Sequence, residues 1–302
     1  MKRIIATILI ILAATGSIHS QNFYVQSGGA FNLASKKQIL ATDYSVHYSS
    51  ALDYVIEDRT IKRSSISGGG MGSLSIGYVT ENSLLLDLTV SRVFGRPVTS
   101  TYEVRYSNGD QTEKDRLQSG YLLFTPSIGI IKPIWCFDLY LSEGLSFGFI
   151  SADHTFDFKL DLDSEPTQKA NLESSFTGKP TVGIATKFGL VKKITPKLSL
   201  FGEVGFTYMN FSPDKNEVTK YSENGVSKLN NLTTSEKLSE YEEQVIVKYG
   251  YVNGEWIEVW DEDSPRKLEK FDIPASFTSI GIGVRFSFQN LHKGSSAPVS
   301  NE

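Results

Sequence analysis

The sequence predicts an all-β fold, an eight-stranded antiparallel up-and-down transmembrane β-barrel with long extracellular loops. Eight segments alternate small or polar residues with large apolar ones, which gives a strand one apolar and one polar face. Short turns and long polar stretches alternate between these segments. No stretch after residue 20 approaches the roughly 18 apolar residues that a membrane helix needs, so spanning would require closed β-structure.

The alternation places the strands in chain order, each with its large apolar residues on the side that would face lipid. The last one, S-I-G-I-G-V-R-F-S-F, has five apolar residues on one face and Ser, Gly and Arg on the other. The eight predicted strands are residues 23–33, 70–79, 83–94, 120–131, 135–150, 181–191, 198–208 and 279–288. Extra wall strands from the last long loop would raise the number to ten.

Tight turns at residues 80–82, 132–134 and 195–196 join three hairpins. Long polar stretches separate the hairpins, at residues 35–68, 95–118, 151–178 and 210–275. This asymmetry is typical of outer-membrane barrels, which have short periplasmic turns and long extracellular loops. It therefore predicts an outer-membrane location with both termini in the periplasm.

The N-terminus has the pattern of a secretory signal. Lys2 and Arg3 precede an apolar run at residues 4–14, and small residues follow. We therefore expect a signal peptide at residues 1–20, the barrel at residues 21–288, and a flexible periplasmic tail at residues 289–302.

The closing motif G-I-G-V-R-F-S-F carries a family resemblance. Over residues 22–288 the chain resembles the small outer-membrane β-barrels of Gram-negative bacteria, typified by the OmpA membrane domain and OmpX, and loosely OmpW. The resemblance implies an insertion signal, recognised by the barrel-insertion machinery, at Gly281, Gly283, Phe286 and Phe288. It also implies contact with outer-membrane lipid and lipopolysaccharide. The tail after Phe288 departs from the family pattern.

Five charged residues are predicted to point into the lumen: Asp87, Asp138, Lys187, Glu203 and Arg285. Counted from the short-turn ends of their strands, they lie at similar depth. Because side chains fill the interior of an eight-stranded barrel, we expect these charges to form an ionic plug. An ion path is the alternative interpretation.

The fourth loop carries an Asn-Gly hairpin signal, V-N-G-E, and holds 14 acidic against 8 basic residues. We predict an interaction surface there formed by Tyr249, Tyr251, Trp256 and Trp260. The hairpin either projects outside the cell or supplies a ninth and tenth wall strand. Its charged residues favour projection, because lipid contact at mid-depth disfavours them.

Catalytic signals are few. After the signal peptide the histidines are His47, His154 and His292, and only His154 has Ser151 and Asp153 beside it. We therefore expect no enzyme, with a lipid A-modifying or protease-type barrel as the alternative. No metal-ligand spacing or cofactor motif occurs, so no cofactor is expected. Net charge of −4 without a basic run argues against nucleic-acid binding.

These observations predict a structural or surface-interaction protein that acts through its extracellular loops. One alternative is a scaffold component of an outer-membrane secretion or assembly system, and another is a passive, porin-like channel for small solutes. The expected partner is an extracellular protein or a secretion-system component.

Overall fold

The computed structural model describes residues 23–35, 38–49, 54–106, 108–245, 249–252, 255–258 and 261–288. Nearly all of the described elements are β-strands, which confirms the predicted all-β class. The predicted signal peptide and the tail after Phe288 lie outside the described residues. Within the described residues, no helix has the length and apolar character that crossing a membrane requires.

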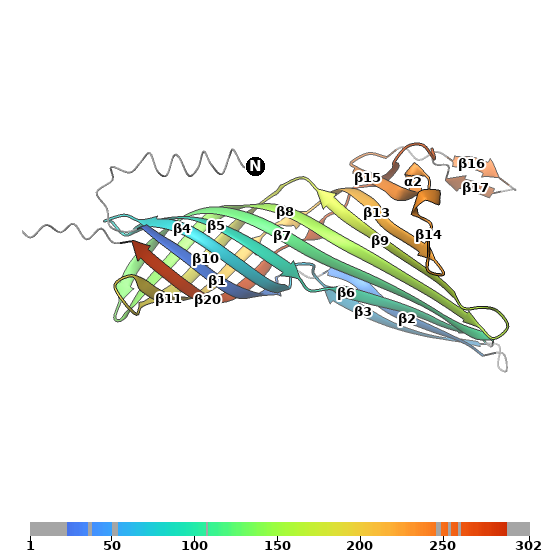
Figure 1. The fold of residues 1–302 in the computed structure, drawn as a ribbon, viewed down its shortest axis with the longest axis horizontal. Helices are drawn as coiled ribbons and strands as arrows, with labels where there is room; N and C mark the ends of the chain where they lie inside the picture. Colours follow the sequence, from blue (N-terminus) through green and yellow to red (C-terminus); the bar gives the residue numbers. More distant parts are fainter. Residues whose placement is uncertain are drawn as a thin grey trace, which may run out of the picture.

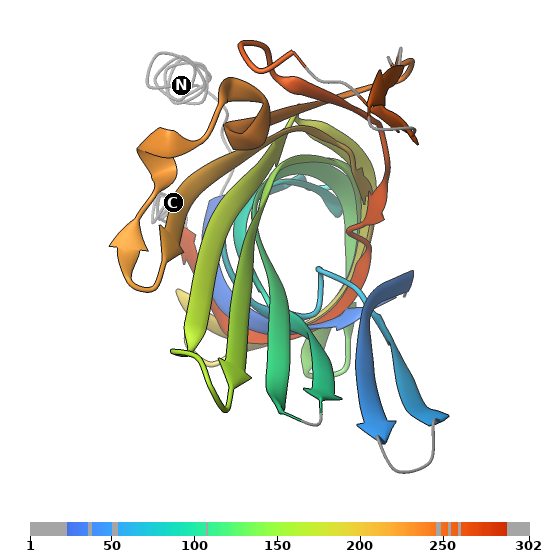
Figure 2. The same ribbon diagram turned by 90° about the vertical axis from the view of Figure 1, so that its right-hand side faces the viewer.

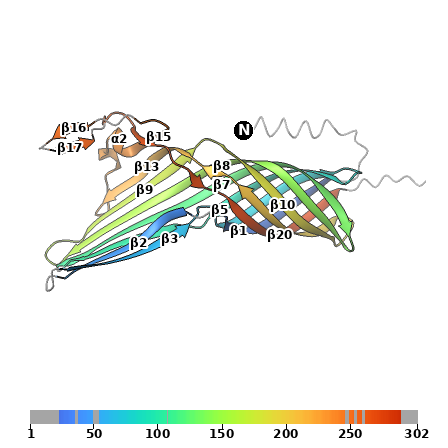
Figure 3. The same ribbon diagram turned by 180° about the vertical axis from the view of Figure 1, so that it is seen from behind.

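Eight strands pair in a closed ring, which Figures 1 and 3 show from the side and Figure 2 shows end-on. Each is antiparallel to its neighbours, and the last strand returns to pair with the first, from Phe23↔Phe288 to Ala34↔Phe277. In order around the ring they are β1 (Phe23–Ala34), β4 (Gly69–Val79), β5 (Leu84–Gly95), β7 (Gly109–Ile134), β8 (Phe137–Leu162), β10 (Thr181–Lys193), β11 (Leu198–Tyr208) and β20 (Phe277–Phe288).

The short turns gather at one end of the ring, which we call the short-turn end (Figure 1). Two of them match the sequence expectation, but residues 132–134 lie inside β7 rather than in a turn. The reversal is made by Trp135 and Cys136 alone, because Ile134 still pairs with Phe137. Trp135 adopts a φ of 56°, as a two-residue hairpin turn demands.

The opposite end, which we call the long-strand end, continues into an open sheet. Strands β7 and β8 have 26 residues each and run far past the predicted limits at residues 120 and 150. Further strands flank them in the order β18-β15-β13-β9-β8 and β7-β6-β2-β3 (Figure 2). We call this sheet the extension; its added strands are β2 (Gln38–Ser49), β3 (Tyr54–Ser64), β6 (Val98–Tyr106), β9 (Gln168–Gly178), β13 (Pro213–Glu223), β15 (Leu238–Glu242) and β18 (Arg266–Glu269).

The region predicted as a fourth loop forms the end of the extension and several small elements. The hairpin predicted around V-N-G-E is present as β16 (Tyr249–Val252) and β17 (Glu255–Glu258), which form a separate two-stranded sheet. The other elements are β12 (Asn210–Phe211), β14 (Val226–Ser227), η1 (Leu229–Asn231), α2 (Thr234–Lys237) and β19 (Ile273–Pro274). Thr233 and Glu236 cap α2 with a reciprocal capping box.

The ring has an exposed apolar outside, and its inside holds two separate apolar clusters. Near the short-turn end the cluster consists of Tyr24, Leu85, Tyr140, Val191 and Phe201. Near the long-strand end a larger cluster consists of Ile66, Val93, Tyr121, Leu123, Ile150, Ala152, Met209, Phe211, Ile273, Ala275 and Phe277. Charged and hydroxylated side chains fill the space between them.

Candidate functional site

The lumen of the ring places four of the five predicted charges in one chain of contacts. Tyr24 Oη donates to Asp87 Oδ2 at 2.6 Å, and Thr89 Oγ1 donates to Asp87 Oδ1 at 2.7 Å. Lys187 Nζ in turn donates to Thr89 Oγ1 at 2.6 Å. On the other side Tyr140 Oη donates to Glu203 Oε2 at 2.6 Å.

Arg285 joins the two halves of this chain. Its guanidinium carbon lies 4.1 Å from the ring centroid of Tyr24 and 5.4 Å from that of Tyr140. Its Nε and Nη2 atoms donate to Gln26 Oε1 at 2.9 and 2.7 Å. We call the whole set the lumen network: Gln26, Tyr24, Asp87, Thr89, Tyr140, Lys187, Glu203 and Arg285.

Neutral side chains therefore connect the charges of the lumen network. Among the described residues, no two of its charged groups lie within ion-pair distance. Each carboxylate accepts a hydrogen bond from a tyrosine, and such bonds to an ionised group are the strong ones. The rings of the same tyrosines face Arg285 and attract it electrostatically.

Asp138 lies apart from the lumen network, contrary to the expectation of equal depth. Its Oδ2 lies 3.3 Å from Lys193 Nζ. The predicted strand began at Trp135, whereas Trp135 and Cys136 form the turn, so Asp138 is the second residue of β8. Asp138 and Lys193 line a cavity of about 350 Å³ at the short-turn end, whose inner wall includes Tyr24 and Arg285.

The remaining space in the lumen is small. A second cavity of about 30 Å³ lies beside Lys187 and Glu203 and reaches Phe277 of the larger apolar cluster. It has room for about two water molecules. The described side chains thus fill most of the lumen between the cavity at the short-turn end and the larger apolar cluster.

Four members of the lumen network are not among the predicted site residues: Tyr24, Gln26, Thr89 and Tyr140. Their signal was present, because they occupy inward positions of the same strands. The two tyrosine rings fit into the lumen because each tyrosine pairs with a glycine on the neighbouring strand. A Cβ at Gly77 would lie 2.6 Å from Tyr24 Cε1, and one at Gly189 would lie 2.5 Å from Tyr140 Cε1.

The residues of the predicted insertion signal divide between the two faces of β20. Phe286 and Phe288 face outward and are exposed. Gly281 and Gly283 face inward, and a Cβ at Gly283 would lie 2.5 Å from Phe201 Cε1. The glycine therefore provides space for Phe201 in the short-turn apolar cluster.

His154 faces a partner that the sequence did not indicate. Its Nε2 lies 2.9 Å from Asp115 Oδ1 on β7. Ser151 and Asp153 lie on the opposite face of β8, because successive residues of a strand alternate, and Asp153 accepts a hydrogen bond from Ser175 instead. Ser174, directly across from His154 on β9, is only 3% exposed.

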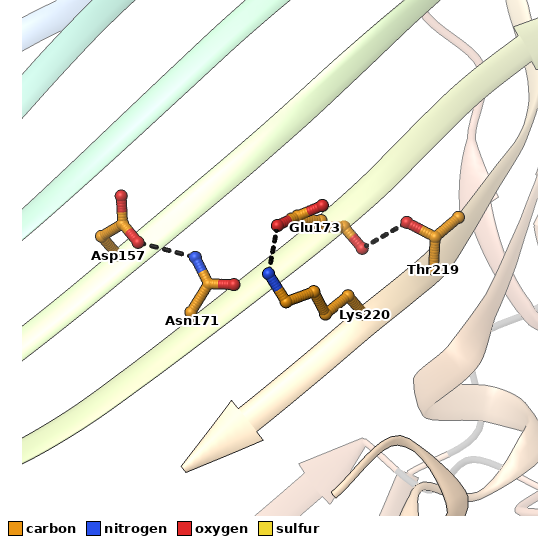
Figure 4. A network of polar contacts seen from close by, with 5 residues as sticks. All are labelled: Asp157, Asn171, Glu173, Thr219 and Lys220. Atoms are coloured by element: carbon orange, nitrogen blue, oxygen red, sulfur yellow. Dashed lines mark hydrogen bonds and ion pairs between the residues drawn. The ribbon is translucent and has the colours of Figure 1, made fainter. Parts of the chain in front are cut away.

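The extension has a polar face made of cross-strand contacts (Figure 4). Asn171 Nδ2 donates to Asp157 Oδ1 at 2.6 Å, and Lys220 Nζ donates to Glu173 Oε1 at 2.7 Å. Lys159 Nζ donates to Asp161 Oδ2 at 2.9 Å, and this hydrogen bond lowers the pKa of Asp161. The opposite face of β8 and β9 is apolar, with Phe156, Phe158, Leu160, Leu172 and Phe176.

The predicted loop interaction surface and His47 can be placed only by the strand in which each residue lies. Tyr249, Tyr251 and Trp256 lie in β16 and β17, whereas Trp260 lies outside the described residues. His47 lies in β2. Across the part of the chain with described coordinates, no group of three or more His, Cys, Asp or Glu side chains gathers as a metal site.

No family model matches the chain, and no curated protein matches it. Among solved structures, the chain is similar to the outer-membrane expressed OmpT of Vibrio cholerae. The similarity covers 88% of this chain and 97% of that chain, at 10% identity and a TM-score of 0.15. A likeness at this level carries no conclusion about fold or function.

Proposed function

We propose that this chain is an outer-membrane β-barrel protein whose extension serves as a surface for interaction with other molecules. The observation that carries the proposal is the outward face of the ring. Large apolar side chains stand exposed around it, among them Phe31 at 58%, Val182 at 60% and Ile282 at 74%. A water-soluble protein rarely exposes so continuous an apolar surface, whereas a barrel wall needs one.

The proposed orientation puts the short-turn end in the periplasm and the extension outside the cell. It agrees with the usual asymmetry of such barrels. Phe23 and Tyr78 pack with ring centroids 5.0 Å apart at the short-turn end, as aromatic residues at a membrane interface do. The proposed role is non-catalytic.

The interaction role rests on the size and open edges of the extension. Within the described residues, β3 and β18 end its sheet on either side, and no further strand pairs with their outer edges, so these could accept one. The partner class is an extracellular protein or a component of a secretion or assembly system. In the second case the chain would act as a scaffold.

Removing residues 244–260 tests the interaction role. We expect the ring to fold as before, with unchanged heat-modifiable gel mobility, because the deletion leaves the Lys267–Glu242 ion pair and the bonds from Thr234 and Ser235 to Glu262 in place. Crosslinking in intact cells should lose a partner that binds the β16–β17 hairpin and keep one that binds the open edges at β3 or β18. Shortening the β8–β9 turn at residues 164–166 is the control. Loss of the folded form in the 244–260 deletion would instead indicate wall strands.

Channel activity is the second candidate function, and the filled lumen argues against it. We expect the purified protein to show no reproducible discrete conductance in planar bilayers. The reason is that, among the described residues, the lumen network and the larger apolar cluster border a cavity of about 30 Å³ where they meet. Stepwise currents that persist across preparations would overturn this expectation and favour a porin-like channel.

A further inference from the structure

Three exposed arginines and one glutamine occupy outward positions on β5, just after it, and on β7, where the apolar band of the ring ends. We call Arg92, Arg96, Arg116 and Gln118 the arginine patch. Arg92 faces outward between Gly72 on β4 and Leu122 on β7. Beyond Leu122, the outward residues of β7 change from apolar to polar.

The structure leaves room for the Arg92 side chain to lie along this surface. A Cβ at Gly120 would lie 3.0 Å from Arg92 Nη2, so the guanidinium lies over the glycine. The guanidinium carbon of Arg92 lies 5.9 Å from the ring centroid of Phe94. Among the described residues no carboxylate lies within ion-pair distance of Arg92, and no oxygen accepts a hydrogen bond from it.

The other members of the arginine patch add donors. Arg116 Nη2 donates to Gln118 Oε1 at 3.0 Å, which leaves the Gln118 amide nitrogen available. The Arg96 backbone nitrogen donates to Gly68 O at 2.5 Å and fixes the chain just after β5. Two acids are near on the same face of β8: Asp153 pairs with Gln118 and accepts a hydrogen bond from Ser175, and Asp157 pairs with Lys114 and accepts one from Asn171.

We propose that the arginine patch binds a phosphate group of an outer-leaflet lipid. The inference rests on the proposed function, because a lipid headgroup reaches these residues only if the ring spans the membrane. Guanidinium groups match phosphate oxygens in pairs, and an arginine near the membrane surface can lay its apolar stem along the wall. The position fits a headgroup, since the patch begins where the lipid-facing side chains end.

The test uses the full chain, folded in a phosphate-free maltoside detergent and examined by native mass spectrometry. Three probes are titrated: a diacyl lipid with a phosphate monoester headgroup, diacylglycerol, and inorganic phosphate. We expect only the phosphate lipid to form a stoichiometric adduct. The double variant R92Q/R116Q should weaken that adduct by about tenfold or more, as loss of charge-assisted hydrogen bonds predicts.

The matched control is K132Q/K192Q, which removes two outward cations at the short-turn end of the ring. It should change the affinity less than about twofold. Equal weakening in both variants, or competition by inorganic phosphate, would overturn the lipid site. Heat-modifiable mobility and partition of each variant into vesicles are measured in parallel. A wild-type chain that fails to enter vesicles contradicts the proposed function, whereas an inserted chain without the adduct contradicts only the arginine patch.

Discussion

Replacing Arg285 by methionine is expected to lower the free energy of unfolding of the ring by about 3–5 kcal/mol, the cost of removing one partner from a buried charged network. Arg285 is 4% exposed and lies between the rings of Tyr24 and Tyr140. Without it Gln26 loses both of its guanidinium donors, and Asp87 and Glu203 lose the nearby positive charge. The measurement is a urea titration of the protein in detergent micelles, followed by gel mobility.

Lys193→Met is the control for this prediction. Lys193 pairs with Asp138 at the short-turn end, but its side chain is 71% exposed. Exposed pairs contribute about 0–1 kcal/mol, so we expect a change within that range. Similar small losses in both variants would show that the lumen network contributes little to stability.

Gly77→Val should disrupt the lumen network through a direct clash with Tyr24. The Tyr24 ring occupies the space above Gly77, so an added side chain would displace the ring from Asp87 and from Arg285. Overpacking typically costs about 1–3 kcal/mol, and the lost tyrosine contacts add to it. Urea titration of the refolded protein checks the size of the loss.

A double-mutant cycle with Tyr24→Ala separates the two causes. We expect the cost of Gly77→Val to fall in the Tyr24→Ala background, because the clash is then absent, so the two effects are not additive. Gly72→Val is the matched control on the same strand, where nothing lies within 4 Å of the added Cβ. Additive costs in the cycle would contradict a direct clash between the two positions.

The wall could be predicted from sequence because the alternation is strictly local. Residues 198–208 were placed at the bounds that β11 has, since a period of two needs no knowledge of the rest of the chain. The sequence predicts the extension only as long polar loops, one of them with a projecting hairpin. Its strand order includes the parallel pairs β2–β6 and β15–β18, which depend on contacts between segments far apart in the sequence.

In the candidate site, too, local features could be predicted from the sequence, whereas contacts between distant segments could not. The inward charges could be identified from parity alone, as Asp87 and Arg285 illustrate. The route by which they meet could not, because it passes through Tyr24 and Tyr140, whose positions depend on Gly77 and Gly189 in neighbouring strands. The sequence also predicts Asp138 too deep in the lumen. The turn lies about two residues later in the chain than predicted, so the Asp138 side chain lies at the short-turn end of the lumen.

Strands β7 and β8 belong both to the wall and to the extension, and this continuity sets a stand-off distance. From Phe124↔Phe147 to Gly109↔Leu162 their pairing runs without interruption. At about 3.3 Å per residue, the ten steps from Ser119 to Gly109 hold the tip about 33 Å beyond the ring along the strand direction. Because the paired strands continue without a break, a molecule bound near the tip would be held at a fixed distance from the ring and at a fixed angle to it.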